Sequence, residues 1–80
     1  MRVIPFQSKD FYANYFWSVK DGYGVKEDIL IKTYLSNFFT FKDIVMLHSL
    51  VGKSKLLMYA KELEMEERIR KIVDLIEKYN

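Results

Sequence analysis

The stretch from Thr40 to Leu63, TFKDIVMLHSLVGKSKLLMYAKEL, decides how the rest of the chain can fold. Its first half, up to Val51, is apolar around most of a helical circumference, and a helix of that kind is buried. Thr40 and Asp43 form a capping-box pattern at its start, and Gly52 is a natural C-terminal cap at its end. The stretch therefore predicts two helices joined by a tight turn at Gly52, the first of them the centre of a small core.

The apolar face of the chain reverses just after Leu63. One stripe precedes this point: Leu56, Ala60 and Leu63. A second stripe follows it: Met65, Ile69, Ile72, Ile76 and Tyr79. At about 100° per residue the two stripes lie on nearly opposite sides of one continuous helix. Either the chain breaks near Glu64, so that both stripes face one core, or a single long helix presents the second stripe to a partner. We favour the break and take the second stripe as the candidate interface, including one for a homodimer.

Two further helices are expected upstream. Ser8 caps a helix over residues 9–19, and carboxylates in the first turn favour another over residues 26–38. Gly22 and Gly24 supply the turn between them. Together these elements predict an all-α fold, with four or five short helices in a helix-turn-helix-like bundle around a central buried helix at about 41–51. Residues 1–80 then form a single helical domain.

Length and composition exclude several classes of protein. Eighty residues make one domain with a marginal core, which a 16% aromatic content helps to fill. The sequence has no cysteine, so it contains neither a disulfide framework nor a thiolate metal site. The apolar run near the N-terminus is too short for a signal peptide, and no window is long enough for a membrane span. We expect a cytoplasmic protein that does not enter a membrane.

No set of residues has the pattern of a catalytic site. Gly52-Lys53-Ser54 resembles the end of a phosphate-binding loop, but the required earlier glycine is Leu47 and no strand precedes it. His48 is the only histidine, and a lone histidine in an apolar pattern is most often a core residue. The sequence therefore predicts a protein that is not an enzyme, with no catalytic residue, cofactor, metal or small-molecule substrate.

Nucleic acid is a possible partner. Lys53, Ser54 and Lys55 open a helix, so their side chains and free backbone N–H groups could hold a phosphate. Helices paired around Gly52 would form a basic helix-turn-helix, whereas a frame over residues 56–73 would begin its second helix with acidic side chains that repel DNA. A net charge of +2 is only a small attraction toward an anionic polymer.

Three groups of residues carry a family resemblance. They are Phe16-Trp17-Ser18-Val19, the helix end Tyr34-Leu35-Ser36-Asn37-Phe38, and Asp43-Ile44 followed by Leu47, Leu50 and Gly52. In these features the chain resembles a family of small helical proteins of bacteria and archaea, often encoded beside nucleotidyltransferase-type toxins and presumed to be antitoxins. Ser18 replaces the usual acid, and Glu64-Met65-Glu66 replaces the usual Gly-Ile-Pro turn. The resemblance implies a non-enzymatic, antitoxin-like interaction module that binds a cognate protein. The alternative is a dimeric helix-turn-helix DNA-binding regulator.

Overall fold

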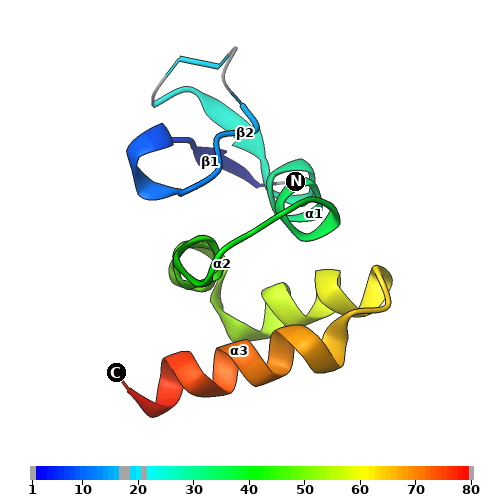
Figure 1. Ribbon diagram of the computed structural model, residues 1–80. Coiled ribbons are helices and arrows are strands. Elements are labelled where there is room, and N and C mark those ends of the chain that lie inside the picture. Colours follow the sequence, from blue (N-terminus) through cyan, green and yellow to red (C-terminus); the bar gives the residue numbers. More distant parts are fainter. Residues whose placement is uncertain (1, 17–18, 21, 80) are drawn as a thin grey trace.

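The computed structural model describes residues 2–16, 19–20 and 22–79, and Figure 1 shows the order of its elements. They are β1 (Val3–Pro5), a 3-10 turn (Ser8–Asp10), β2 (Gly24–Lys26), α1 (Glu27–Ser36), α2 (Phe41–Glu62) and α3 (Glu66–Lys78). The described part of the chain thus contains three α-helices and a two-stranded sheet. The prediction of an all-α bundle of four or five helices is wrong.

A short β-hairpin is the first departure from that prediction. β1 and β2 pair antiparallel, with Ile4 opposite Val25 and both side chains buried. Beyond the strands, the Phe6 amide donates to the Tyr23 carbonyl at 3.0 Å. A Cβ at Gly24 would lie 2.1 Å from Cγ1 of Val3, so only glycine allows this approach. Strands of three residues are too short to show the alternation that identifies a strand in sequence.

The predicted helix over residues 9–19 is the second departure. Only residues 8–10 form a helical turn, and the chain from Phe11 to Phe16 is irregular; Trp17 and Ser18 lie outside the described residues. The Phe11 ring stacks on Tyr34 with centroids 4.5 Å apart, and the Tyr34 hydroxyl donates to the Ala13 carbonyl. Aromatic side chains are modest helix formers, so these contacts with α1 outweigh the local helical pattern.

The predictions for α1 and for the start of α2 are confirmed in outline. The helix expected over residues 26–38 is α1, shorter by a residue or two at each end. Thr40 caps α2: its hydroxyl accepts from the Asp43 amide, and the Asp43 carboxylate accepts from the Thr40 amide at 2.9 Å. Asp43 also accepts from the Tyr12 amide at 2.6 Å, which fastens the N-terminal segment to α2.

Gly52 divides α2 into two halves. Its φ of 85° and ψ of 167° are non-helical, and the two halves run in clearly different directions (Figure 1). The expected turn at Gly52 is therefore present as a kink. The first half is less buried than predicted, however. Ile44 and Leu47 are buried, whereas Phe41 is 53% exposed. This helix covers the core with one face instead of passing through its centre.

The chain breaks at Glu64, which confirms the favoured alternative. Glu64 has a φ of 59°, and α3 returns antiparallel beside the second half of α2 (Figure 1). The Glu64 amide donates to the Lys61 carbonyl at 3.1 Å and the Met65 amide to the Ala60 carbonyl at 2.9 Å. These two bonds form a Schellman motif, which ends a helix by satisfying its last carbonyls. Both apolar stripes can therefore contribute to one core.

Candidate interaction surface

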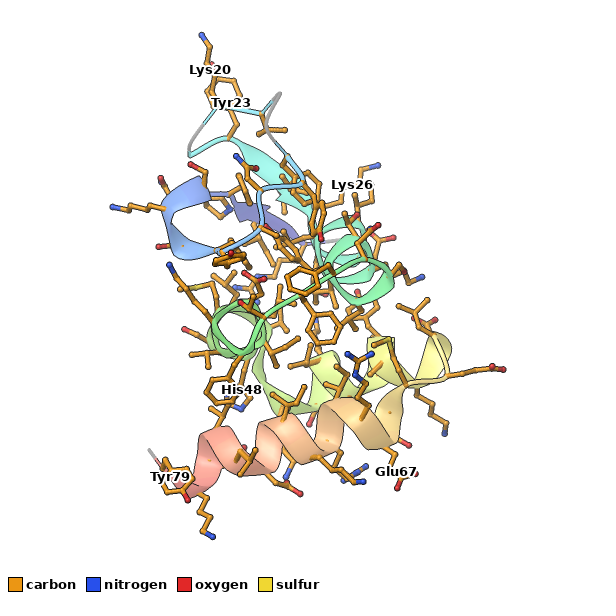
Figure 2. The ribbon with its side chains drawn as sticks, viewed as in Figure 1. Lys20, Tyr23, Lys26, His48, Glu67 and Tyr79 are labelled. Carbon is orange, nitrogen blue, oxygen red and sulfur yellow. The ribbon has the colours of Figure 1, made fainter. Side chains whose placement is uncertain are left out.

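The apolar face of α3 is wider than the surface that α2 covers. Three of its side chains are buried inside the chain: Ile69, Val73 and Ile76. Met65 and Ile72 are half-buried, while Leu75 is 49% and Tyr79 is 77% exposed. The predicted interface stripe is therefore divided. Ile69 and Ile76 pack within the chain, and Tyr79 faces solvent at the C-terminal end of α3 (Figure 2).

The uncovered part of α3 borders a small hollow between two helices. Its volume is about 120 Å³, and its walls come from the first half of α2 and the last turns of α3. We call it the outer groove; its residues are Phe41, Val45, Leu75, Ile76 and Tyr79. The capping box at Thr40 sets where α2 begins and so holds Phe41 at this edge. Contiguous exposed apolar surface is typical of a protein-binding site.

Sequence reasoning misses three of the groove residues. The start of α2 is apolar on nearly all sides, which predicts Phe41 and Val45 in the core, and Leu75 lies outside the predicted stripe. The sequence contains one signal for this exposed surface, which is the excess of apolar positions in the first half of α2. A helix with apolar residues all round, in a chain too short to enclose it, must leave some of them exposed.

A wider and more charged hollow lies at the other end of α3. Its lining comes from the α2–α3 turn and the first half of α3: Glu64, Met65, Glu67, Arg68, Lys71 and Ile72. The Arg68 guanidinium lies 4.8 Å from the centre of the Phe39 ring, a cation–π contact that links α3 to the segment before α2. Carboxylates and cations are interspersed here, so the lining has no single sign that would select a charged ligand.

A buried carboxylate joins three elements elsewhere in the molecule. The Glu27 side chain, 4% exposed, begins α1, where a negative charge favours the positive end of the helix dipole. It lies 3.1 Å from the Lys55 ammonium and 3.9 Å from the Arg2 guanidinium, and it accepts from the Tyr59 hydroxyl at 3.1 Å. The pKa of Tyr59 is raised, mainly because the hydroxyl is buried and to a smaller extent because it donates a hydrogen bond to Glu27. The cluster links α1 to α2 and to Arg2, the residue before β1.

The predicted phosphate contacts Lys53, Ser54 and Lys55 do not form one free basic surface. The Lys53 ammonium lies 3.3 Å from the Glu77 carboxylate of α3, whereas Lys55 pairs with Glu27 of α1. Ser54 is exposed between them. Each lysine therefore already has a carboxylate partner, and the two partners belong to different helices.

His48 is only half-buried and takes part in the same contact with α3. Its Nε2 lies 3.4 Å from Glu77, between the first half of α2 and the end of α3 (Figure 2). The pKa of Glu77 is lowered by its hydrogen bond with His48, which has the largest effect, and by the hydrogen bond from Lys53. Within residues 2–16, 19–20 and 22–79, no three His, Asp or Glu side chains converge as metal ligands.

Comparison with known proteins gives no family for this chain. Neither protein families, nor curated proteins, nor solved structures yielded a match. In the same described ranges, no helix combines the length and apolar character that crossing a membrane requires. The function of the chain is therefore inferred from its own geometry.

Proposed function

We propose that this protein is a non-enzymatic interaction module that binds a protein partner through the outer groove. The observation that carries the proposal is the exposure of Phe41, Leu75 and Tyr79 around one hollow, on two helices that are anchored in the core. A few side chains near the centre of a protein interface, tyrosine prominent among them, supply most of its binding free energy. The proposal retains the cytoplasmic location expected from the sequence.

The state of the buried carboxylates supports a non-catalytic role. Glu27 is occupied by Lys55 and Tyr59, and Asp43 by backbone amides of the α2 cap and of Tyr12. Both groups hold elements of the fold together. A catalytic acid or base would need one of its oxygens to face a substrate site. The contacts of Glu27 and of Asp43 leave no carboxylate oxygen facing such a site.

The sequence resemblance extends the proposal to an antitoxin-like role. In that case the partner is the toxin encoded by the adjacent gene, and the outer groove is the surface that engages it. The alternative of a DNA-binding regulator has less support, because Lys53 and Lys55 are both engaged in ion pairs. Phosphate binding would have to displace a carboxylate from each.

Co-expression of the tagged chain with the product of the adjacent gene tests this role. We expect a complex that survives size-exclusion chromatography and that Leu75→Lys abolishes. Met58→Lys is the matched control, since Met58 is an equally exposed apolar residue of α2 outside the groove. A complex that forms equally well with Leu75→Lys would show that the partner binds elsewhere. The absence of a complex with the wild-type chain would contradict the antitoxin-like role.

A further inference from the structure

We infer that a second copy of this chain covers the exposed face of α3, with the two α3 helices antiparallel about a twofold axis. The inference rests on the proposed function, because the second copy covers the same apolar surface when the protein partner is not bound there. It is carried by two features of α3. The first is a stripe of three apolar side chains and one arginine that continues the outer groove along the helix. The second is a row of charges of alternating sign, in which opposite charges face each other when two copies of the helix run antiparallel.

The stripe runs the length of α3. Arg68, Ile72, Leu75 and Tyr79 are spaced i, i+4, i+7 and i+11, which places them within about 60° of one another around the helix. Leu75 and Tyr79 line the outer groove, and Ile72 lines the hollow at the opposite end. A helix that lies along this stripe would therefore contact both hollows at once. The extent of the stripe matches a helix of the length of α3 itself.

The charges beside the stripe alternate in sign. They follow one flank of the helix in the order Glu67, Lys71, Asp74 and Lys78, and all four residues are exposed. The Glu67 and Lys71 side chains are 88% and 76% exposed, so their ion pair at 3.8 Å leaves both largely solvated. In Figure 2, Glu67 points away from α2. These side chains are available to a neighbouring helix.

An antiparallel pair turns this alternation into attraction. When the axis passes between positions 72 and 73, Glu67 faces Lys78 of the second copy, and Lys71 faces Asp74 of the second copy. The twofold axis repeats both contacts, giving four attractive pairs. Flanking pairs of this kind set partner and orientation in helix pairs. In a parallel twofold pair the same flank of the two helices lies on opposite sides of the contact, so these charges would not meet one another.

The same register also pairs the apolar residues. Leu75 comes to lie between Arg68 and Ile72 of the second copy, and Tyr79 reaches the region of Met65 and Arg68. The tyrosine ring would there meet both a methionine side chain and a guanidinium, which are favourable neighbours for an aromatic ring. The residues left exposed in one chain thus become the centre of the contact.

Two charge variants test the inference by sedimentation equilibrium. Glu67→Lys with Asp74→Lys makes the flank wholly positive, and Lys71→Glu with Lys78→Glu makes it wholly negative. The wild-type chain should be a dimer. Each variant alone should self-associate about 100-fold more weakly, because all four pairs become repulsive. An equimolar mixture of the two variants should dimerise again. Circular dichroism of each variant checks that the exposed substitutions leave the helices formed.

Cysteine cross-linking tests the register, and the absence of native cysteine makes it unambiguous. On oxidation, a mixture of Lys71→Cys and Asp74→Cys chains should give mainly the mixed disulfide. Three results would each overturn the inference. The wild-type chain could be monomeric at millimolar concentration, the charge variants could dimerise as well as the wild type, or disulfides between identical variants could predominate. A monomer that still binds the adjacent gene product through Leu75 would overturn the inference alone and leave the proposed function standing.

Discussion

At the scale of single residues, Glu27 connects the start of α1 to the second half of α2. Its carboxylate is almost fully removed from water, which is costly unless cations and hydrogen-bond donors surround it. Arg2 supplies one of them from the start of the chain, and Lys55 and Tyr59 supply the others from the second half of α2. Lys55, which the sequence offers as a phosphate contact, is thereby a structural residue whose replacement should affect folding first.

Lys55→Met should lower the free energy of unfolding by about 1–3 kcal/mol, because the buried Glu27 loses its nearest cation. Urea denaturation measures the change. Adding Glu27→Gln to this variant should restore part of the loss, since a neutral amide needs no counter-charge. Lys61→Met, an exposed lysine of the same helix, is the control and should change stability little. A double variant that is less stable than Lys55→Met would contradict this account.

At the scale of secondary-structure elements, two positive-φ residues determine where the long helical stretch changes direction. Gly52 has a φ of 85° and a ψ of 167°, a combination that is essentially restricted to glycine. Glu64 has a φ of 59° at the end of α2, in the left-handed region that side chains with a Cβ disfavour. The first site therefore has its preferred residue, while the second carries strain that a substitution can relieve.

Glu64→Gly should stabilise the protein by about 0.5–1 kcal/mol, because glycine is the preferred residue at this position of a Schellman motif. In a chain of this size, such a gain corresponds to a rise of roughly 2–8 °C in the melting temperature, which calorimetry can measure. Glu64→Ala removes the same charge but keeps the Cβ, so it should give no comparable rise. Equal effects of the two substitutions would assign the gain to charge instead of backbone conformation.

The contact of Glu77 with His48 and Lys53 should make the docking of α3 sensitive to acid. These partners lower the pKa of Glu77 below its usual value of 4.5. A carboxylate with a depressed pKa contributes stability above the pKa of the unfolded chain, and this contribution is lost as the pH falls through the folded value. Unfolding free energies of the wild type and Glu77→Gln should therefore differ at pH 6 and converge as the pH falls through the lowered pKa of Glu77. Parallel pH profiles would contradict this contact.

At the scale of the whole molecule, the elements form layers that share one small hydrophobic core. The hairpin and the N-terminal aromatic residues pack on α1 and the first half of α2, and α3 closes the other side (Figure 1). Residues of every layer belong to the same buried cluster. A chain of this length has little stability in reserve, roughly 4–12 kcal/mol. Substitutions of α3 side chains that point into the core should therefore lower the free energy of unfolding much more than substitutions of those that point outward.

Ile69→Ala should cost about 2–5 kcal/mol, since Ile69 is completely buried and its truncation leaves a cavity. Leu75→Ala, measured in dilute protein, should cost about 1 kcal/mol or less because half of that side chain is already exposed. Thermal unfolding of the two variants separates the internal part of the predicted stripe from its external part. Similar losses would show that Leu75 is as essential to the core as Ile69.

The sequence alone determined the features that depend on neighbouring residues. The cap at Thr40, the change of direction at Gly52, the span of α1 and the break at Glu64 all follow from local pattern, because capping and backbone preferences act within a few positions. The reversal of the apolar face at Leu63 favours such a break over one long helix, since both stripes can reach one core only if the helix ends between them.

Only the tertiary structure decided the hairpin, the irregular N-terminal segment and the exposed groove. Ile4 and Val25 pair across twenty-one positions of sequence, and Phe11 leaves its expected helix to stack on Tyr34. Phe41 has the same apolar character as a core residue, yet the described elements leave 53% of it exposed. The physical reason is that burial depends on which distant surfaces meet, and a chain of eighty residues has too few of them to enclose every apolar side chain.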